Sequence, residues 1–185
     1  MKKQVVLLSS LLLVGMLTRI IPHWPNFTAV GAVALAGGAL FRLRWIAYLV
    51  PVALLFLSDL FINNVLYASF HPGFQWFTSG FGFIYGGFLL MVLIGRFGIG
   101  SSRKGSSVLA AGIGGSLLFY LISNFGVWLG SPMYPQTLGG LVSSYVAGLP
   151  FLVNQAAGTL VYSAVIFGVA WYGIPKITNN YQESY

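Results

Sequence analysis

Long apolar runs separated by short polar connections dominate this chain. A helix needs roughly 20 mostly apolar residues to cross the hydrocarbon core of a bilayer. By that measure six runs predict membrane spans, at residues 4–21, 26–41, 45–67, 78–95, 108–129 and 151–173. The second run is short and is the weakest of the six. If it re-entered the membrane without crossing, every later connection would change sides.

A seventh apolar segment, at residues 138–149, has only a dozen residues before Pro150. This length is typical of an interfacial or re-entrant helix. We therefore predict a short outer interfacial helix before the last span. We expect residues 1–177 to form a single six-helix transmembrane domain, followed by a short polar cytoplasmic tail at residues 178–185.

Positive charges occur at alternate connections between the apolar runs. They lie before the first run and after the second, fourth and sixth, at Lys2, Lys3, Arg42, Arg44, Arg96, Arg103, Lys104 and Lys176. Cytoplasmic connections of membrane proteins are enriched in Lys and Arg. The pattern predicts six spans with both termini in the cytoplasm, and it leaves only Arg19 on the outer side.

The composition agrees with a membrane protein. The chain is 57% hydrophobic and 6% charged, whereas a soluble domain is about 25% charged. The net charge of +7 does not indicate nucleic acid binding, because the basic residues are spread over connections that would meet anionic lipid head groups. The absence of cysteine excludes disulfides and thiolate chemistry. We expect a multi-pass protein of the bacterial cytoplasmic (inner) membrane.

The strongly polar residues of the predicted spans all lie in the outer halves. Buried polar groups in lipid are costly unless they are paired or face a cavity. A cluster at one depth therefore predicts a cavity open to the outer side. The candidate substrate-binding residues are Arg19, His23, Asn26, Asp59, Asn63, His71, Asn124 and Asn154.

Asp59 is the only acidic residue before Glu183. An ionisable residue inside a span suggests a functional site. The simpler explanation is an ion pair with Arg19 that joins the first and third spans. The two roles are compatible, because a paired arginine can still donate to a ligand.

The outer connections at residues 22–27, 70–77 and 131–135 are rich in proline and aromatic residues. They suit either an aromatic belt at the membrane interface or a lid over a ligand. We predict that the connections carrying His23 and His71 roof the outer cavity. The two histidines could also ligate a metal, although a lone histidine in a loop usually does not.

Enzyme motifs are absent from the sequence. The Gly- and Ser-rich stretch at residues 98–105 lacks the spacing of a phosphate-binding loop and follows no strand. There is no paired carboxylate, nucleophile motif or metal-ligand pair at helical spacing. We expect neither an enzyme, nor a metal site, nor a cofactor other than a vitamin bound as substrate.

Small residues are dense in three of the predicted spans. The fourth span contains Gly82 and Gly86, the fifth contains Gly112, Gly114 and Gly115, and the second contains Gly31, Ala32, Ala34, Ala36, Gly37, Gly38 and Ala39. Small residues allow membrane helices to approach closely. They serve either packing within this bundle or docking of another membrane subunit.

Four stretches carry a resemblance to known proteins. Residues 18–35, Ser58-Asp59, residues 123–128 and residues 134–141 resemble a family of small uncharacterised bacterial membrane proteins labelled putative transport proteins. That family is similar, more weakly, to the substrate-binding S components of energy-coupling factor transporters, and most to the solitary cobalamin type. This likeness rests on six spans, an arginine ending span one, an acid in span three and a proline opening span six.

The resemblance implies a membrane subunit that binds a vitamin, for example cobalamin, on its outer side. S components commonly meet their coupling subunit through an Ala-x-x-x-Ala face on span one, which this chain lacks. Two functions remain open. The first is a transport-class subunit that captures a small polar organic molecule, for which one Arg, one Asp and several amides suit a neutral or zwitterionic ligand. The second is a non-enzymatic accessory or structural subunit of a larger membrane complex.

Overall fold

A computed structural model describes residues 2–100, 102 and 104–173, and all regular elements in these ranges are helices. Short π-helical segments extend three of the main helices, at Ile62–Leu66, Gly95–Ile99 and Val169–Gly173, and a 3-10 turn follows at Ala68–Phe70. The six main helices are α1 (Lys2–Ile20), α2 (Val30–Leu40), α3 (Arg44–Phe61), α4 (Phe81–Ile94), α5 (Gly105–Gly130) and α6 (Leu138–Gly168).

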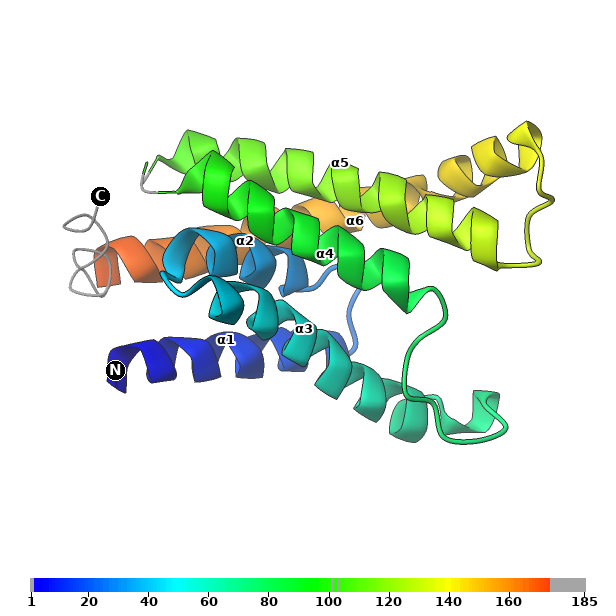
Figure 1. Ribbon diagram of the computed structural model, residues 1–185, viewed down its shortest axis with the longest axis horizontal. Coiled ribbons are helices and arrows are strands. Elements are labelled where there is room, and N and C mark those ends of the chain that lie inside the picture. Colours follow the sequence, from blue (N-terminus) through cyan, green and yellow to red (C-terminus); the bar gives the residue numbers. More distant parts are fainter. Residues whose placement is uncertain (1, 101, 103, 174–185) are drawn as a thin grey trace.

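The helices pass back and forth between the two ends of an elongated bundle (Figure 1). We call one end the terminal end, because α1 begins there, the extension of α6 ends there, and it holds the α2–α3 and α4–α5 connections. Arg42, Arg44, Arg96 and Lys104 belong to these two connections. The basic connections therefore share one end, as the charge pattern predicts. Arg103, Lys176 and the predicted tail lie outside the described residues.

Four helices are long and apolar enough to cross a membrane: Arg44–Leu66, Phe81–Ile99, Gly105–Gly130 and Leu138–Tyr172. The first three agree closely with predicted spans. This composition is that of an all-helical, multi-pass membrane protein. The apolar part of α1, Leu7–Ile20, and the 11-residue α2 are shorter apolar helices, so six crossings and the orientation of the termini stay predictions.

Helix α2 begins four residues later than predicted because the chain first makes a tight turn. Asn26 has a left-handed backbone conformation with φ of 64°, and the Thr28 N–H donates to the Asn26 carbonyl. The Ala29 N–H then donates to Thr18 Oγ1 at 3.0 Å. A helix of 11 residues is only about 16 Å long. Nearly every residue of α2 is buried against its neighbours, so this helix forms the centre of the bundle.

Gly38 of α2 and Gly95, in the π-helical extension of α4, permit close backbone contact between these two helices. A methyl group added at Gly38 would collide with the Val92 carbonyl, and one added at Gly95 would collide with the Leu35 carbonyl. Side-chain rearrangement cannot relieve these clashes because the opposing atoms belong to the backbone. The small residues of α2 therefore serve packing within this bundle, which is one of the two explanations that the sequence leaves open.

The prediction of a separate interfacial helix at residues 138–149 is wrong. These residues form the first half of α6, which continues through Pro150 to Gly168. Hydrogen bonds between α5 and α6 stabilise this half: Tyr120 Oη of α5 donates to the Tyr145 carbonyl at 2.6 Å, and Ser144 Oγ of α6 donates to the Asn124 carbonyl at 2.8 Å. Proline removes one backbone donor, but packing against a neighbouring helix allows a membrane helix to continue past it.

Candidate binding pocket

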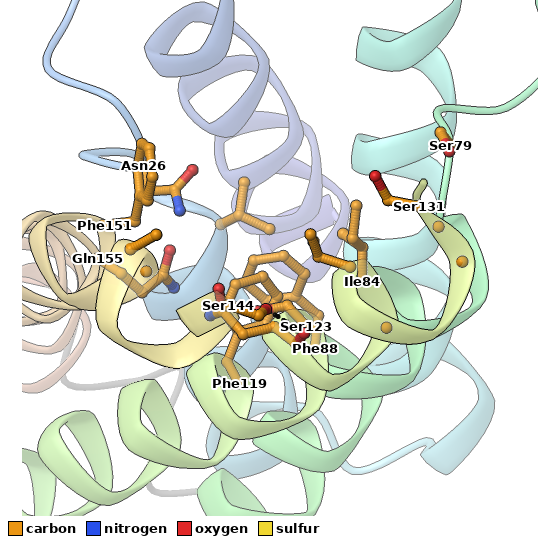
Figure 2. Close-up of a pocket in the computed structure, with 18 of the residues that line it drawn as sticks. Asn26, Ser79, Ile84, Phe88, Phe119, Ser123, Ser131, Ser144, Phe151 and Gln155 are labelled. Atoms are coloured by element: carbon orange, nitrogen blue, oxygen red, sulfur yellow. Dashed lines mark hydrogen bonds between the residues drawn. The ribbon is translucent and has the colours of Figure 1, made fainter. Parts of the chain in front are cut away.

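A pocket of about 770 Å³ opens at the end of the bundle opposite the terminal end. Its walls come from the α1–α2 connection, α4, α5 and the first half of α6. The floor contains Phe88 and Phe119, whose rings are tilted with centroids 4.3 Å apart. Figure 2 shows these rings below the cavity, with Asn26, Phe151 and Gln155 on one side and Ile84 and Ser131 on the other. The volume is within the range of pockets for drug-sized ligands, roughly 300–1,000 Å³.

Among the described residues that line the pocket, Arg19 is the one charged side chain, and residues of α3 bind it from behind. Its Nη2 lies 2.6 Å from Asp59 Oδ1, and its Nη1 lies 2.5 Å from Ser58 Oγ and 3.3 Å from the Leu55 carbonyl. Tyr85 Oη on α4 donates to Asp59 Oδ2 at 2.9 Å. The network joins α1, α3 and α4 and balances the positive charge. The predicted Arg19–Asp59 pair is thus confirmed.

Two amides enter the pocket from α5 and α6. Gln155 is only 3% exposed and lines the wall. Its Nε2 makes a long donation of 3.5 Å to Thr159 Oγ1. Asn124 donates through Nδ2 to the Tyr120 carbonyl at 2.9 Å, and its side chain packs on Gly148 of α6. Each amide keeps a carbonyl oxygen for which the described residues supply no hydrogen-bond donor. An amide oxygen that faces a cavity in this way can accept from a ligand.

The rim of the pocket comes mainly from the α5–α6 connection. Ser131, Met133 and Tyr134 line it. Two hydrogen bonds stabilise the connection: Trp128 Nε1 donates to the Pro135 carbonyl at 3.0 Å, and Gln136 Nε2 donates to the Trp128 carbonyl at 2.5 Å. The predicted roof therefore differs in part from the observed one. The α3–α4 connection projects away from the bundle axis (Figure 1) and contributes only Tyr67, Ser79 and Gly80.

Four of the eight predicted site residues line the pocket: Arg19, His23, Asn26 and Asn124. The other four do not. Asp59 lies behind Arg19, and Asn63 donates to Thr78 Oγ1 at 3.1 Å. His71 is exposed in the α3–α4 connection, and Asn154 is only partly buried on α6. Whether any of the eight binds a substrate stays a prediction.

The wall also contains residues that the predicted site omits, chiefly Gln155, Ser144 and the two floor phenylalanines. A signal for α6 was present in the sequence. Small and polar residues recur there at helical spacing of three or four residues or their sum, at Ser144, Gly148, Gln155, Thr159 and Ser163. This stripe marks the packed face and selects Gln155 over its neighbour Asn154. No comparable signal marks Phe88 or Phe119, because apolar residues surround both.

The donor set of the pocket suits hydrogen bonding and stacking better than acid–base chemistry. His23 Nδ1 lies 2.6 Å from the Trp24 carbonyl, which uses one ring nitrogen in a local contact. Among the described residues there is no group of three His, Cys, Asp or Glu side chains that could hold a metal ion. The wall combines aromatic surface, amides and hydroxyls around one neutralised arginine.

Comparison with known proteins identifies a family without assigning an activity. No curated protein and no solved structure matches the chain. A family model described as "Family of unknown function (DUF6580)" matches residues 1–179, which is nearly the whole sequence. The chain therefore belongs to the DUF6580 family.

Proposed function

We propose that this protein is a transport-class binding subunit that captures a small organic molecule from the outer face of the bacterial cytoplasmic membrane. The observation that carries the proposal is the pocket of about 770 Å³, in which the buried Gln155 amide faces the cavity with one weak internal hydrogen bond. Buried polar side chains in structures are normally well satisfied. A ligand that donates to the Gln155 carbonyl oxygen would add a second hydrogen bond to this amide.

The electrostatics of the pocket favour a ligand without net charge. Asp59, Ser58 and the Leu55 carbonyl already bind the Arg19 guanidinium. A bound anion would therefore have to compete with the Asp59 carboxylate for this guanidinium. Phe88 and Phe119 offer ring surface on the floor, where a flat or apolar part of a ligand would pack. A neutral, vitamin-like molecule with amide or hydroxyl groups fits these features.

Adjacent amides on α6 provide a matched test of this function. Gln155 lines the pocket and Asn154 does not. The purified protein should be screened by thermal shift against neutral and charged vitamins, cobalamin included, and a hit should be titrated calorimetrically. Gln155→Leu should weaken binding by about tenfold or more, because a lost hydrogen bond in a buried site costs roughly 1–3 kcal/mol. Asn154→Leu should leave binding unchanged.

Two results would contradict the proposed function. The first is a screen in which no compound raises the melting temperature, since a ligand at a hundredfold excess over its dissociation constant stabilises a protein by about 2.7 kcal/mol. The second is equal weakening of binding by both substitutions, which would place the ligand elsewhere or attribute the loss to misfolding.

A second candidate function, an accessory subunit of a larger membrane complex, is favoured by one observation. Gly82 and Gly86 are spaced four residues apart on α4, and a methyl group added at either would meet no atom within 4 Å. They thus differ from the packed glycines of α2. Close approach of a partner helix is a common use of such a pair. Co-purification of a second membrane protein that Gly86→Leu abolishes would support this function over ligand capture.

A further inference from the structure

A second cavity lies at the terminal end, between α5 and α6. These two helices diverge toward that end of the bundle (Figure 1), and a groove of about 300 Å³ fills the space between them. Its walls are apolar apart from Ser163 and the side-chain tips of two aromatic residues. The lining includes Val108, Leu109, Phe167, Trp171 and Tyr172.

The depth of each residue in the groove follows from one contact between the helices. Gly112 of α5 packs against Leu160 of α6, and the two helices are antiparallel. Each step from Gly112 toward the start of α5 therefore matches one step from Leu160 toward the end of α6. In this register Ser163 lies opposite Leu109. Leu109 comes four residues after Gly105, the first residue of α5. At 1.5 Å per residue the difference in depth is about 6 Å.

The mouth of the groove attracts anions. Helix α5 starts at Gly105, and Lys104 precedes it with an exposed side chain. The first backbone bond of the helix runs from the Ser107 N–H to the Lys104 carbonyl, so the N–H groups of Gly105 and Ser106 precede the ladder. Unpaired N–H groups and the helix dipole make a helix start favourable for phosphate.

Deeper in the groove, a polar atom has no partner. Ser163 has no exposed surface, and its Oγ makes no hydrogen bond with any described residue. A buried hydroxyl without a partner is costly. A ligand with a phosphate at the mouth and a hydrogen-bond acceptor about one helical turn further in matches these two features.

We propose that this groove binds one anionic diacyl phospholipid. The phosphate lies at the start of α5 beside Lys104, a glycerol ester carbonyl accepts from Ser163 Oγ, and one acyl chain lies along the apolar wall. Trp171 and Tyr172 then stand near the head-group level, where these residues are enriched in membrane proteins. This lipid site is separate from the outer pocket and does not depend on the proposed function.

The apolar lining of the groove suits an acyl chain, which is narrower than a helix with its side chains, about 10–12 Å wide. Lys104, directly before the first residue of α5 and with an exposed side chain, adds charge complementarity to an anionic head group.

Fluorescence of Trp171 tests the site directly. The full chain with its other four tryptophans changed to phenylalanine is placed in vesicles of phosphatidylcholine, or of phosphatidylcholine with phosphatidylglycerol, with one lipid brominated at a time. Brominated phosphatidylglycerol should quench Trp171 at a lower mole fraction than brominated phosphatidylcholine. Lys104→Gln should reduce this preference about fivefold, since a lysine near an anionic surface contributes about 1 kcal/mol. Arg44→Gln is the matched control and should leave it unchanged.

Two further pairs separate the groove from the general membrane surface. Gly168→Leu fills the groove and should weaken quenching by both lipids, whereas Gly114→Leu should not, although both glycines have open space beside them. Ser163→Ala should lower the phosphatidylglycerol affinity, and inorganic phosphate should not compete.

If the tryptophan-reduced chain does not fold, native mass spectrometry of the same single variants in the otherwise unchanged chain gives the readout as retained lipid. Equal quenching by both lipids, or equal effects of Lys104→Gln and Arg44→Gln, would overturn the proposal.

Discussion

At the scale of single residues, Asp59 serves first as the partner of a wall residue. It is 2% exposed and contacts Arg19 and Tyr85, while Arg19 itself reaches the pocket. The carboxylate therefore fixes the orientation of the guanidinium and neutralises it. This arrangement explains how an arginine can stand in the wall of a pocket that presents no net charge.

The buried ion pair leads to a prediction about stability. Asp59→Asn and Arg19→Gln should each lower the free energy of unfolding by about 3–5 kcal/mol, because each substitution leaves the charge of the other residue without its partner in a buried site. The double variant should lose less than the sum of the two. Thermal unfolding of the three variants in one detergent measures this difference. Strictly additive losses would show that the two side chains do not interact in the folded protein.

Tyr85 gives a milder change at the same site. Tyr85→Phe removes only the hydroxyl that donates to Asp59 Oδ2 at 2.9 Å and should lower the free energy of unfolding by about 1.5–3 kcal/mol, the range for hydrogen bonds to charged groups. Tyr48→Phe is the control on α3. If Tyr85→Phe unfolds at the same temperature as Tyr48→Phe, the hydroxyl does not stabilise the carboxylate.

The sequence predicts the polar residues of the site better than the apolar ones. Arg19 and Asn124 stand out because polar groups are rare in spans, and the structure places both in the wall. Neighbouring residues on one helix point in directions about 100° apart, so a polar pair such as Asn154 and Gln155 does not by itself show which member faces inward. Phe88 and Phe119 form the floor, but nothing in an apolar run marks them in advance.

At the scale of helices, boundaries depend on tertiary contacts that the hydropathy pattern does not contain. Apolar length correctly predicts α3, α4 and α5. The start of α2 depends on Thr18, which accepts from the Ala29 N–H across the α1–α2 connection. The start of α6 depends on α5, whose Tyr120 binds the Tyr145 carbonyl before the proline. Pro150 suggests a break in the sequence, but packing against α5 carries the helix through it.

The glycines on two helix faces should respond oppositely to alanine. Gly38→Ala should lower the free energy of unfolding by about 1–3 kcal/mol, the usual cost of overpacking, because the new methyl group meets backbone atoms of α4. Gly86→Ala faces open space and should be neutral or stabilising, since alanine favours a helix over glycine by about 1 kcal/mol. Thermal unfolding of the two variants makes the comparison, and equal destabilisation would contradict the observed α2–α4 contact.

At the scale of the whole molecule, charge and cavities separate the two ends of the bundle. The basic connections gather at the terminal end, and the polar pocket opens at the other. Cytoplasmic enrichment of Lys and Arg then predicts that the pocket faces outward. Helix length alone does not decide how the bundle sits in a membrane, because α2 has only 11 residues and the apolar part of α1, Leu7–Ile20, is also short. Their connection contains His23, which lines the pocket. The side of the membrane on which this connection lies shows whether α1 and α2 each cross.

Accessibility labelling tests this topology, and the absence of cysteine makes the chain suitable for it. Trp24→Cys and Gly73→Cys report on the α1–α2 and α3–α4 connections, and Ser102→Cys reports on the α4–α5 connection. Trp24 is 70% exposed and Gly73 has open space around it, so neither change should disturb the fold. With a membrane-impermeant maleimide on intact cells, the cysteines at positions 24 and 73 should react, and the one at position 102 should react only after lysis.

Labelling at position 73 without position 24 would mean that α1 and α2 do not each cross. Labelling at position 102 alone would invert the orientation and turn the pocket toward the cytoplasm, against the proposed capture from outside.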